Sequence, residues 1–139
     1  MDAQLCLGVD AQPAELGLVR RAVRTWLAAQ AWPSSAADAL VFAVVEAFGN
    51  SVEHAYRGLD TGRVHIDLAV EPAGSGRRRA TAVVTDTGRW RDGAHCTEGR
   101  GNGLALIRSI ARGLTVTTDA AGTRVTVWTD DEDVLSVEG

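Results

Sequence analysis

The sequence has few of the features that mark disulfide-rich or zinc-stabilised proteins. Only two of its 139 residues are cysteines, Cys6 and Cys96, which are too few and too far apart for a disulfide scaffold or a structural zinc site. His95 beside Cys96 would supply two adjacent metal ligands, but two ligands do not make a site. We therefore expect both thiols to be reduced.

The sequence also lacks an export signal and a long apolar run. Met1 to Gln4 carries no basic stretch followed by apolar residues, and no run of about 18 apolar residues occurs. A net charge of −4 gives no general attraction for nucleic acid, although the basic triplet 77–79 is a local exception. We expect a cytoplasmic protein that contacts neither membrane nor nucleic acid directly and whose partners are proteins or nucleotides.

What the sequence does contain is ordinary for a globular domain. Hydrophobic residues make up 45% and charged residues 23% of the chain, a composition that suits an enzyme and a binding module equally well. The length suits one core, so we expect a single domain over residues 1–129. Residues 130–139 begin with an acidic run and are expected to form a solvated tail.

The hydrophobic pattern predicts both strands and helices. Alternating apolar residues indicate strands over 4–9, 64–70, 80–85, 114–118 and 123–129. Helical spacing indicates helices over 16–27, 36–54 and 104–110, with Ser34 and Ser35 offering an N-cap to the second. Residues 71–79 are typical of a hairpin loop, and 87–102 of a long functional loop. This order predicts a two-layer α/β sandwich, a mixed and largely antiparallel sheet with its helices on one face.

Three polar residues of the long predicted helix share one face. Glu46, Asn50 and His54 recur every four residues and avoid the apolar stripe. A polar helical face is most often simply solvated. However, Gly49 and Asn50 are poor helix formers, and glycine within a helix costs up to about 1 kcal/mol relative to alanine. Close approach of a ligand would explain both residues, so the solvated and the functional interpretation stay open.

Asn50 and Glu46 have a chemical logic as a pair. An amide oxygen suits Mg²⁺, a hard ion that takes one or two protein oxygens and completes its octahedron with phosphates and waters. Glu46, one turn earlier, could accept a proton from an attacking hydroxyl or position a water. The pair alone has little specificity.

Two further segments resemble parts of a nucleotide site. Asp86 ends an apolar strand and precedes Thr87-Gly88, where a carboxylate could accept a hydrogen bond from a nucleobase amino group; an ordinary Asp-x-Gly turn is the simpler interpretation. The glycine-rich segment 99–103 opens the third predicted helix, so its backbone N–H groups would face an anion such as phosphate. It is neither a Walker A loop nor a Rossmann fingerprint, and a glycine-rich linker competes with the phosphate site.

Taken in this order, the motifs resemble the anti-sigma factor serine kinases of the GHKL ATPase superfamily, whose nucleotide pocket is called the Bergerat fold. The resemblance covers residues 4–129 and rests on four motifs: Glu46-x-x-x-Asn50-x-x-x-His54-Ala55-Tyr56, Asp86-x-Gly88, Gly101-x-Gly103-Leu104 and Gly122-Thr123. Each motif is weak alone, and the four in register with the expected elements are specific.

The resemblance implies a role for each matching residue. Asn50 would coordinate Mg²⁺, and Glu46 would be the catalytic base. Asp86 would bind the adenine amino group, with Gly88 and Thr123 completing the adenine contacts. The triphosphate would lie against two glycines and beneath a lid over residues 89–102; these glycines are Gly101 and Gly103. His54 is expected to pack rather than to react.

Family resemblance also implies partners. Such proteins bind a sigma factor and use ATP to phosphorylate a serine of an anti-anti-sigma antagonist, and they form homodimers. One departure bears on catalysis: relatives continue Asp-x-Gly with x-Gly, whereas this chain has Arg89-Trp90, and tryptophan lacks the freedom of glycine. The indole could instead pack over the base. A non-catalytic switch that binds its partners by shape and charge is therefore the alternative to a kinase.

Overall fold

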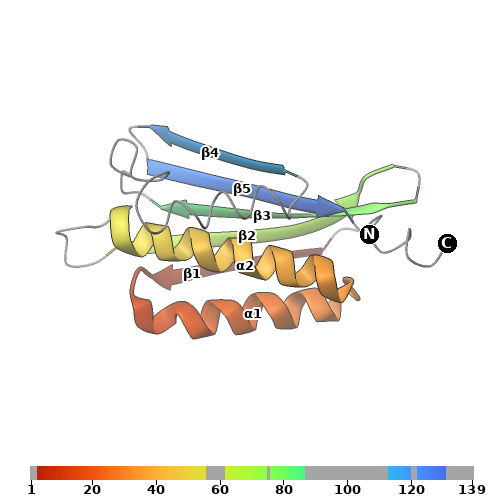
Figure 1. The fold of residues 1–139 in the computed structure, drawn as a ribbon, viewed down its shortest axis with the longest axis horizontal. Coiled ribbons are helices and arrows are strands. Elements are labelled where there is room, and N and C mark those ends of the chain that lie inside the picture. The colour runs from red at the N-terminus through yellow and green to blue at the C-terminus, as the bar shows by residue number, and fades with distance from the viewer. Residues whose placement is uncertain (1–2, 56–61, 75, 87–112, 120–121, 131–139) are drawn as a thin grey trace.

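The computed structural model describes residues 3–55, 62–74, 76–86, 113–119 and 122–130. These ranges hold two α-helices and five strands (Figure 1). In chain order the elements are β1 (Ala3–Asp10), a 3-10 turn η1 (Pro13–Glu15), α1 (Leu16–Ala29), α2 (Ser34–Asn50), a π-helical turn η2 (Ser51–Ala55), β2 (Arg63–Pro72), β3 (Arg78–Asp86), β4 (Gly113–Asp119) and β5 (Gly122–Asp130). The predicted helix 104–110 lies outside the described residues.

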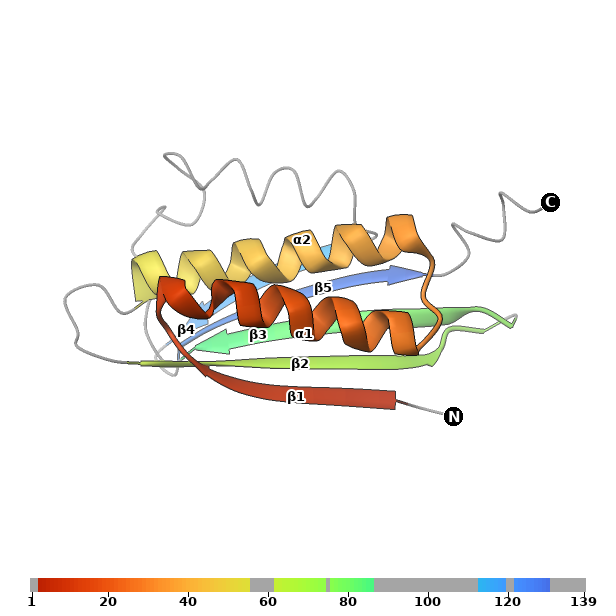
Figure 2. The same cartoon turned by 90° about the horizontal axis from the view of Figure 1, so that it is seen from below.

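The five strands form one sheet in the order β1-β2-β3-β5-β4, and every pairing among them is antiparallel. Both helices lie on the same face of this sheet, with α1 alongside β1 (Figure 2). The predicted two-layer α/β sandwich with helices on one face is therefore confirmed. The described strands contain no parallel pair, so the mixed character that we expected is not found among them.

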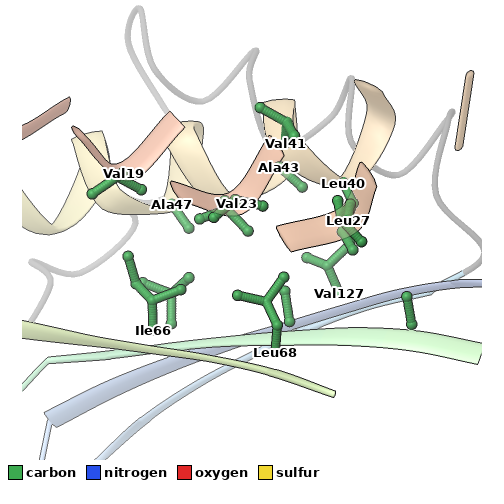
Figure 3. Packing of buried hydrophobic residues seen from close by; sticks show 14 of the residues in the cluster. Val19, Val23, Leu27, Leu40, Val41, Ala43, Ala47, Ile66, Leu68 and Val127 are labelled. Carbon is green, nitrogen blue, oxygen red and sulfur yellow. The ribbon is translucent and has the colours of Figure 1, made fainter. Parts of the chain in front are cut away.

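The core lies between the helices and the sheet, as the side chains in Figure 3 show. In β2 the burial alternates from Arg63 to Val70, and the inward residues Val64, Ile66, Leu68 and Val70 are at most 3% exposed. The facing stripe of α1 is Val19, Val23 and Leu27, all fully buried. Because full burial of one such side chain contributes about 1.5–3 kcal/mol, this double layer holds the polar residues of α2 in a fixed place.

The second helix differs from its prediction at both ends. Neither predicted serine caps it: the N-cap is Pro33, which makes no side-chain hydrogen bond and instead accepts one from the Ala37 N–H at 2.8 Å through its carbonyl. At the other end the α-helix stops at Asn50, and residues 51–55 continue as a π-helical turn. A π-helical turn inside a helix is a local widening that often accompanies a functional site.

The second helix is unusually apolar, and its position against the sheet explains why. Ser34–Glu53 contains an 18-residue window with a mean hydropathy of 1.3, which by length and composition alone would suffice to cross a membrane. The stretch is not an unbroken apolar run, because it contains Asp38 and Glu46. In the structure 56% of the window is buried inside the protein, as in any helix that lies on a sheet.

Arg78 and Arg79, two of the three arginines of the basic triplet, belong to a strand rather than to a loop. β2 continues to Pro72, and β3 begins at Arg78. The loop that was predicted over 71–79 is therefore limited to residues 73–77. Arg78 lies 4.8 Å from the centre of the Trp32 ring and donates to the Gln30 carbonyl at 3.0 Å. Arg79 makes a two-point ion pair with Asp130 at 2.8 and 3.3 Å. Two of the three arginines therefore join the hairpin to neighbouring elements.

Candidate functional site

The end of α2, the end of β3 and the start of β5 lie at the same end of the sandwich, at the left in Figure 1, and each contributes a buried polar side chain. Asn50, Ser51, Asp86 and Thr123 are each only 1% exposed. They come from the end of α2, the start of η2, the end of β3 and the start of β5, so three segments far apart in the sequence meet here. Polar groups inside an apolar core cost free energy unless they are hydrogen-bonded, so the cost of burying these four side chains depends on what they contact.

Asn50 owes its position to the junction between α2 and the π-helical turn. It is the last residue of the α-helix, and the next backbone N–H, that of Ser51, is shared between the carbonyls of Ala47 and Phe48. Phe48 and Ala47 are fully buried, which anchors this turn to the sheet. Asn50 is therefore not on a solvated face, and the interpretation of residues 46, 50 and 54 as a solvated stripe fails at its central position.

Ser51 belongs to the buried cluster, although the sequence pattern did not indicate it. Its hydroxyl donates to Oδ2 of Asp86 at 2.6 Å, and both side chains are buried. A hydroxyl-to-carboxylate bond of this length belongs to the strong, charge-assisted class. This bond ties the helix end, where Asn50 lies, to the end of β3. The only available signal was a small polar residue directly after Asn50, which a four-residue spacing does not select.

Thr123 lies directly opposite Asp86 in the sheet. The two residues are register partners of β3 and β5, and Asp86 faces Val64 of β2 on its other side. Gly122, which precedes Thr123, has a φ of 138°, a conformation that favours glycine over residues with a Cβ. The Gly122-Thr123 motif therefore combines a backbone requirement of the β4–β5 hairpin with a hydroxyl beside the carboxylate.

Glu46 lies one turn before Asn50 on the same helix and is half-buried. Its spacing leaves it on the same helical face as Asn50, and it is less buried than Asn50. His54 lies in the π-helical turn, and its side chain is outside the described set. Of the predicted site residues, Asn50, Asp86 and Thr123 therefore meet at one end of the fold, with Glu46 adjacent along α2.

The remaining predicted residues cannot be placed. Gly88, Gly101, Gly103, Trp90 and the whole expected lid 89–102 lie outside the described residues, as does Tyr56. Residues 95 and 96, considered above as metal ligands, fall in the same range. Among the described residues no three His, Cys, Asp or Glu side chains come together as a metal cluster.

The donor set of the cluster fits a purine nucleotide with a magnesium ion. A buried carboxylate oriented by a hydroxyl can accept hydrogen bonds from an exocyclic amino group, and the neighbouring threonine hydroxyl can donate or accept. The amide oxygen of Asn50 is a hard ligand of the kind that Mg²⁺ accepts singly, with phosphates and waters filling its other positions. Ser51 follows Asn50 in the chain and bonds to Asp86, so the two residues that would hold the metal and the nucleobase lie in one connected arrangement.

Residues 9–129 match the family described as the histidine kinase-like ATPase domain. A solved structure of the RsbU and RsbW domains of Rv1364c from Mycobacterium tuberculosis is similar at 28% identity, with a TM-score of 0.66 over 91% of this chain. This chain covers 32% of that structure, about a third of its length.

Two structures from Erythrobacter litoralis have the same fold. The histidine kinase domain of its EL346 blue-light activated histidine kinase matches 84% of this chain at 23% identity, with a TM-score of 0.52. A second structure of that kinase matches 84% at 22% identity, with a TM-score of 0.54. This chain covers 59% and 40% of those two chains. The comparison agrees with two helices packed on a five-stranded sheet.

Proposed function

The chain belongs to the histidine kinase-like ATPase domain family, and on that premise we propose that it is an ATP-dependent protein serine kinase that also acts as an anti-sigma factor. The observation that carries the proposal is the buried cluster of Asn50, Ser51, Asp86 and Thr123, where helix and sheet ends bring an amide, two hydroxyls and a carboxylate together. The similarity to a structure containing an RsbW domain supports the same direction.

Each residue of the cluster has a distinct part in the proposal. Asp86, held by Ser51, accepts the adenine amino group, and Thr123 lines the same edge of the base. Asn50 supplies one oxygen to Mg²⁺. Gly88, Gly101 and Gly103 complete the pocket as the sequence motifs imply. When bound, ATP with Mg²⁺ supplies the phosphoryl group and neutralises the charge that develops during its transfer.

Glu46 is the proposed catalytic base. It lies one turn from Asn50 and is half-buried, so it is close to the metal ligand and still accessible from outside. A carboxylate there can accept the proton of a serine hydroxyl on a second protein; the serine oxygen would take the γ-phosphoryl group of ATP, and ADP would leave. A protein substrate could not reach a fully buried base. Glu46 is only partly buried, so a substrate serine can reach it.

We further propose that the substrate serine belongs to an anti-anti-sigma antagonist and that a sigma factor is the second partner. A phosphate on the antagonist adds about −1.5 to −2 charges at neutral pH, which disfavours its interface through repulsion and desolvation. Unphosphorylated antagonist would then release the sigma factor. The proposal includes a homodimer in the cytoplasm, without direct contact to membrane or nucleic acid.

A non-catalytic partner switch is the second candidate. The observation that favours it is Trp90, which stands where relatives of the resembled family have a second glycine after Asp86-x-Gly88. A bulky residue there can restrict the nucleotide or its release. In that case the pocket would hold nucleotide as a structural ligand, or none, and the partners would exchange by binding alone.

Phosphate transfer separates the two candidates. Purified chain is incubated with labelled ATP, Mg²⁺ and candidate antagonist domains from its own organism, beside Asn50→Ala and Glu46→Ala variants. We expect Asn50→Ala to weaken Mg²⁺-dependent ATP binding, and Glu46→Ala to keep binding and lose transfer. Glu53→Ala is the matched control, because Glu53 is an exposed glutamate of the following turn.

The outcomes have separate meanings. Wild-type chain that binds ATP and labels no antagonist would favour the partner switch. No calorimetric signal from ATP or ADP at millimolar concentration would refute nucleotide binding altogether. A loss of transfer in Glu53→Ala as large as in Glu46→Ala would remove Glu46 from its proposed role.

A further inference from the structure

The acidic run near the end of the chain begins inside the fold. Its first residue, Asp130, is the last residue of β5 and is only 5% exposed. The Asp130 carboxylate accepts two hydrogen bonds from the Arg79 guanidinium, at 2.8 and 3.3 Å. The two residues are also register partners of β5 and β3, which pair along their lengths (Figure 1). The first acid of the run therefore pairs with an arginine of the basic triplet 77–79.

The basic triplet and the acidic run are complementary in order as well as in sign. Residues 77–79 are three consecutive arginines, and residues 130–132 are Asp, Asp and Glu. In an antiparallel pair, each step forward along one strand is matched by one step back along its neighbour. Because Asp130 lies opposite Arg79, the next two positions after β5 are in register with the other two arginines. Each arginine of the triplet is thus matched to an acid.

The backbone at the start of β3 is oriented to pair with such a continuation. The Arg77 carbonyl accepts from the Ala73 N–H at 2.8 Å, and the Arg77 N–H donates to the Gly74 carbonyl at 3.0 Å, so the backbone groups of Arg77 point toward the β2 side. Successive residues of a strand direct these groups to opposite sides. The N–H and C=O of Arg78 therefore point toward the β5 side, one step beyond the last register pair of the described residues.

The register of these two strands matters at their other ends. Asp86 ends β3, and Thr123 lies opposite it at the start of β5, so the same register brings both side chains into the buried cluster. Side chains alternate between the two faces of a strand, so a slip of two residues would keep the inward face of β5 inward and still separate this pair. Such a slip would also leave at least one arginine of the triplet opposite an uncharged residue.

We propose that residues 131 and 132 continue β5 along β3, so that residues 130–132 and 77–79 form a charge-matched clasp that holds the register of the two strands. Residues 131–139 lie outside the described residues, and the pair of Arg79 with Asp130 is the first rung of the clasp. Each further rung is a cross-strand pair of opposite charge, and such pairs contribute more as a network than singly. The clasp does not depend on nucleotide binding.

Amide hydrogen exchange followed by NMR tests the backbone pairing in the full chain. Asp131→Pro removes the N–H that the clasp pairs with the Arg78 carbonyl, and we expect the Arg78 amide to exchange about tenfold faster in this variant. The amide of Val84, in the interior of β3, should keep its exchange rate, which separates loss of the clasp from unfolding of the sheet. Val137→Pro is the matched control, because residue 137 lies beyond the matched acids; it should leave the Arg78 amide unchanged.

Charge exchange tests the match between acids and arginines. Arg77→Glu and Glu132→Arg should each lower Tm by about 2–4 °C, and the double variant should recover about half of the summed loss or more. Asp133→Arg is the control, since in this register residue 133 lies opposite Gly76. It should not restore the Tm of Arg77→Glu. In about 1 M NaCl the losses should shrink to less than half, because salt screens exposed charges.

Four results would overturn the proposal. The Arg78 amide could exchange at the same rate in the wild-type chain and in Asp131→Pro, which would exclude the strand pairing. An absence of recovery in the double variant would exclude the match of Glu132 to Arg77. Losses of Tm that persist in full at high salt would exclude a clasp made by charge. Recovery of Arg77→Glu by Asp133→Arg as complete as by Glu132→Arg would mean general attraction in place of a fixed register.

Discussion

Replacing Ser51 by alanine tests whether the bond between Ser51 and Asp86 holds the site together. The substitution removes one oxygen from a residue that is 1% exposed and leaves the backbone of the π-helical turn able to form as before. What it removes is the donor to Oδ2 of Asp86 at 2.6 Å. The carboxylate stays buried, so the loss falls on an acceptor that water cannot readily reach.

The size of the effect follows from the class of the bond. Hydrogen bonds to charged groups contribute about 1.5–3 kcal/mol, and a buried acceptor that loses its donor forfeits a similar amount. For a domain of this size, that corresponds to a fall of roughly 5–10 °C in Tm. If Asp86 binds the purine amino group as proposed, the same variant should also bind ATP more weakly, because the carboxylate is no longer held in one orientation.

The assay is a double-mutant cycle on urea unfolding with Ser51→Ala, Asp86→Asn and the pair. Contacting residues show a coupling of about 0.5–3 kcal/mol, and we expect at least 1 kcal/mol here. Ser34→Ala is the control, since Ser34 lies in the first turn of the same helix, is exposed and caps nothing; it should change stability by less than about 0.5 kcal/mol. Additive effects of Ser51→Ala and Asp86→Asn would show that the bond is not a stabilising contact.

Three further predictions concern residues outside the site. Gly113→Ala should destabilise by about 1–3 kcal/mol in denaturant unfolding, because a Cβ there would lie 1.9 Å from Cζ2 of Trp128, and unchanged stability would contradict this packing. Gly17→Ala should stabilise by about 0.4–1 kcal/mol in the same assay, since nothing lies within 4 Å of the added Cβ and the unfolded chain loses freedom; a loss would contradict it. The Asp67 carboxylate raises the pKa of the Cys6 thiol. Asp67→Asn should therefore lower that pKa and speed alkylation of Cys6 near pH 8, measured in a Cys96→Ala background. An unchanged alkylation rate would rule out Asp67 as the cause.

The elements of the fold were predictable because each has a clear hydrophobic period. β2 alternates buried and exposed residues along most of its length, as its sequence pattern requires. The ends were less predictable. Ser34 and Ser35 are strong N-cap residues by type, yet Pro33 takes the cap position with extended backbone, and its carbonyl begins the helix. The N-cap propensity of a residue type is an average over many helices. It does not take into account the backbone conformation of the residue before it, here Pro33.

The site was predictable only in part. The spacing of residues 46, 50 and 54 identifies a shared face, but whether that face is buried depends on strands more than ten residues away in sequence. Asn50 is buried because the ends of β3 and β5 meet the end of α2, a convergence that no local pattern contains. Ser51 escaped notice for a related reason: it lies one residue off that face, and its partner Asp86 is 35 residues distant.

Each end of the sandwich holds a buried carboxylate, Asp130 at one end and Asp86 at the other, and the hydrogen-bond donors described for them differ. At the hairpin end, Asp130 is 5% exposed and receives two bonds from the Arg79 guanidinium, which itself lies 5.9 Å from the Trp128 ring. That arrangement closes the end of β5 with an opposite charge supplied by the protein. At the other end, Asp86 receives a neutral hydroxyl from Ser51 and has an amide and a second hydroxyl nearby. The Ser51 hydroxyl orients the Asp86 carboxylate, which in the proposed function accepts a hydrogen bond from the adenine amino group.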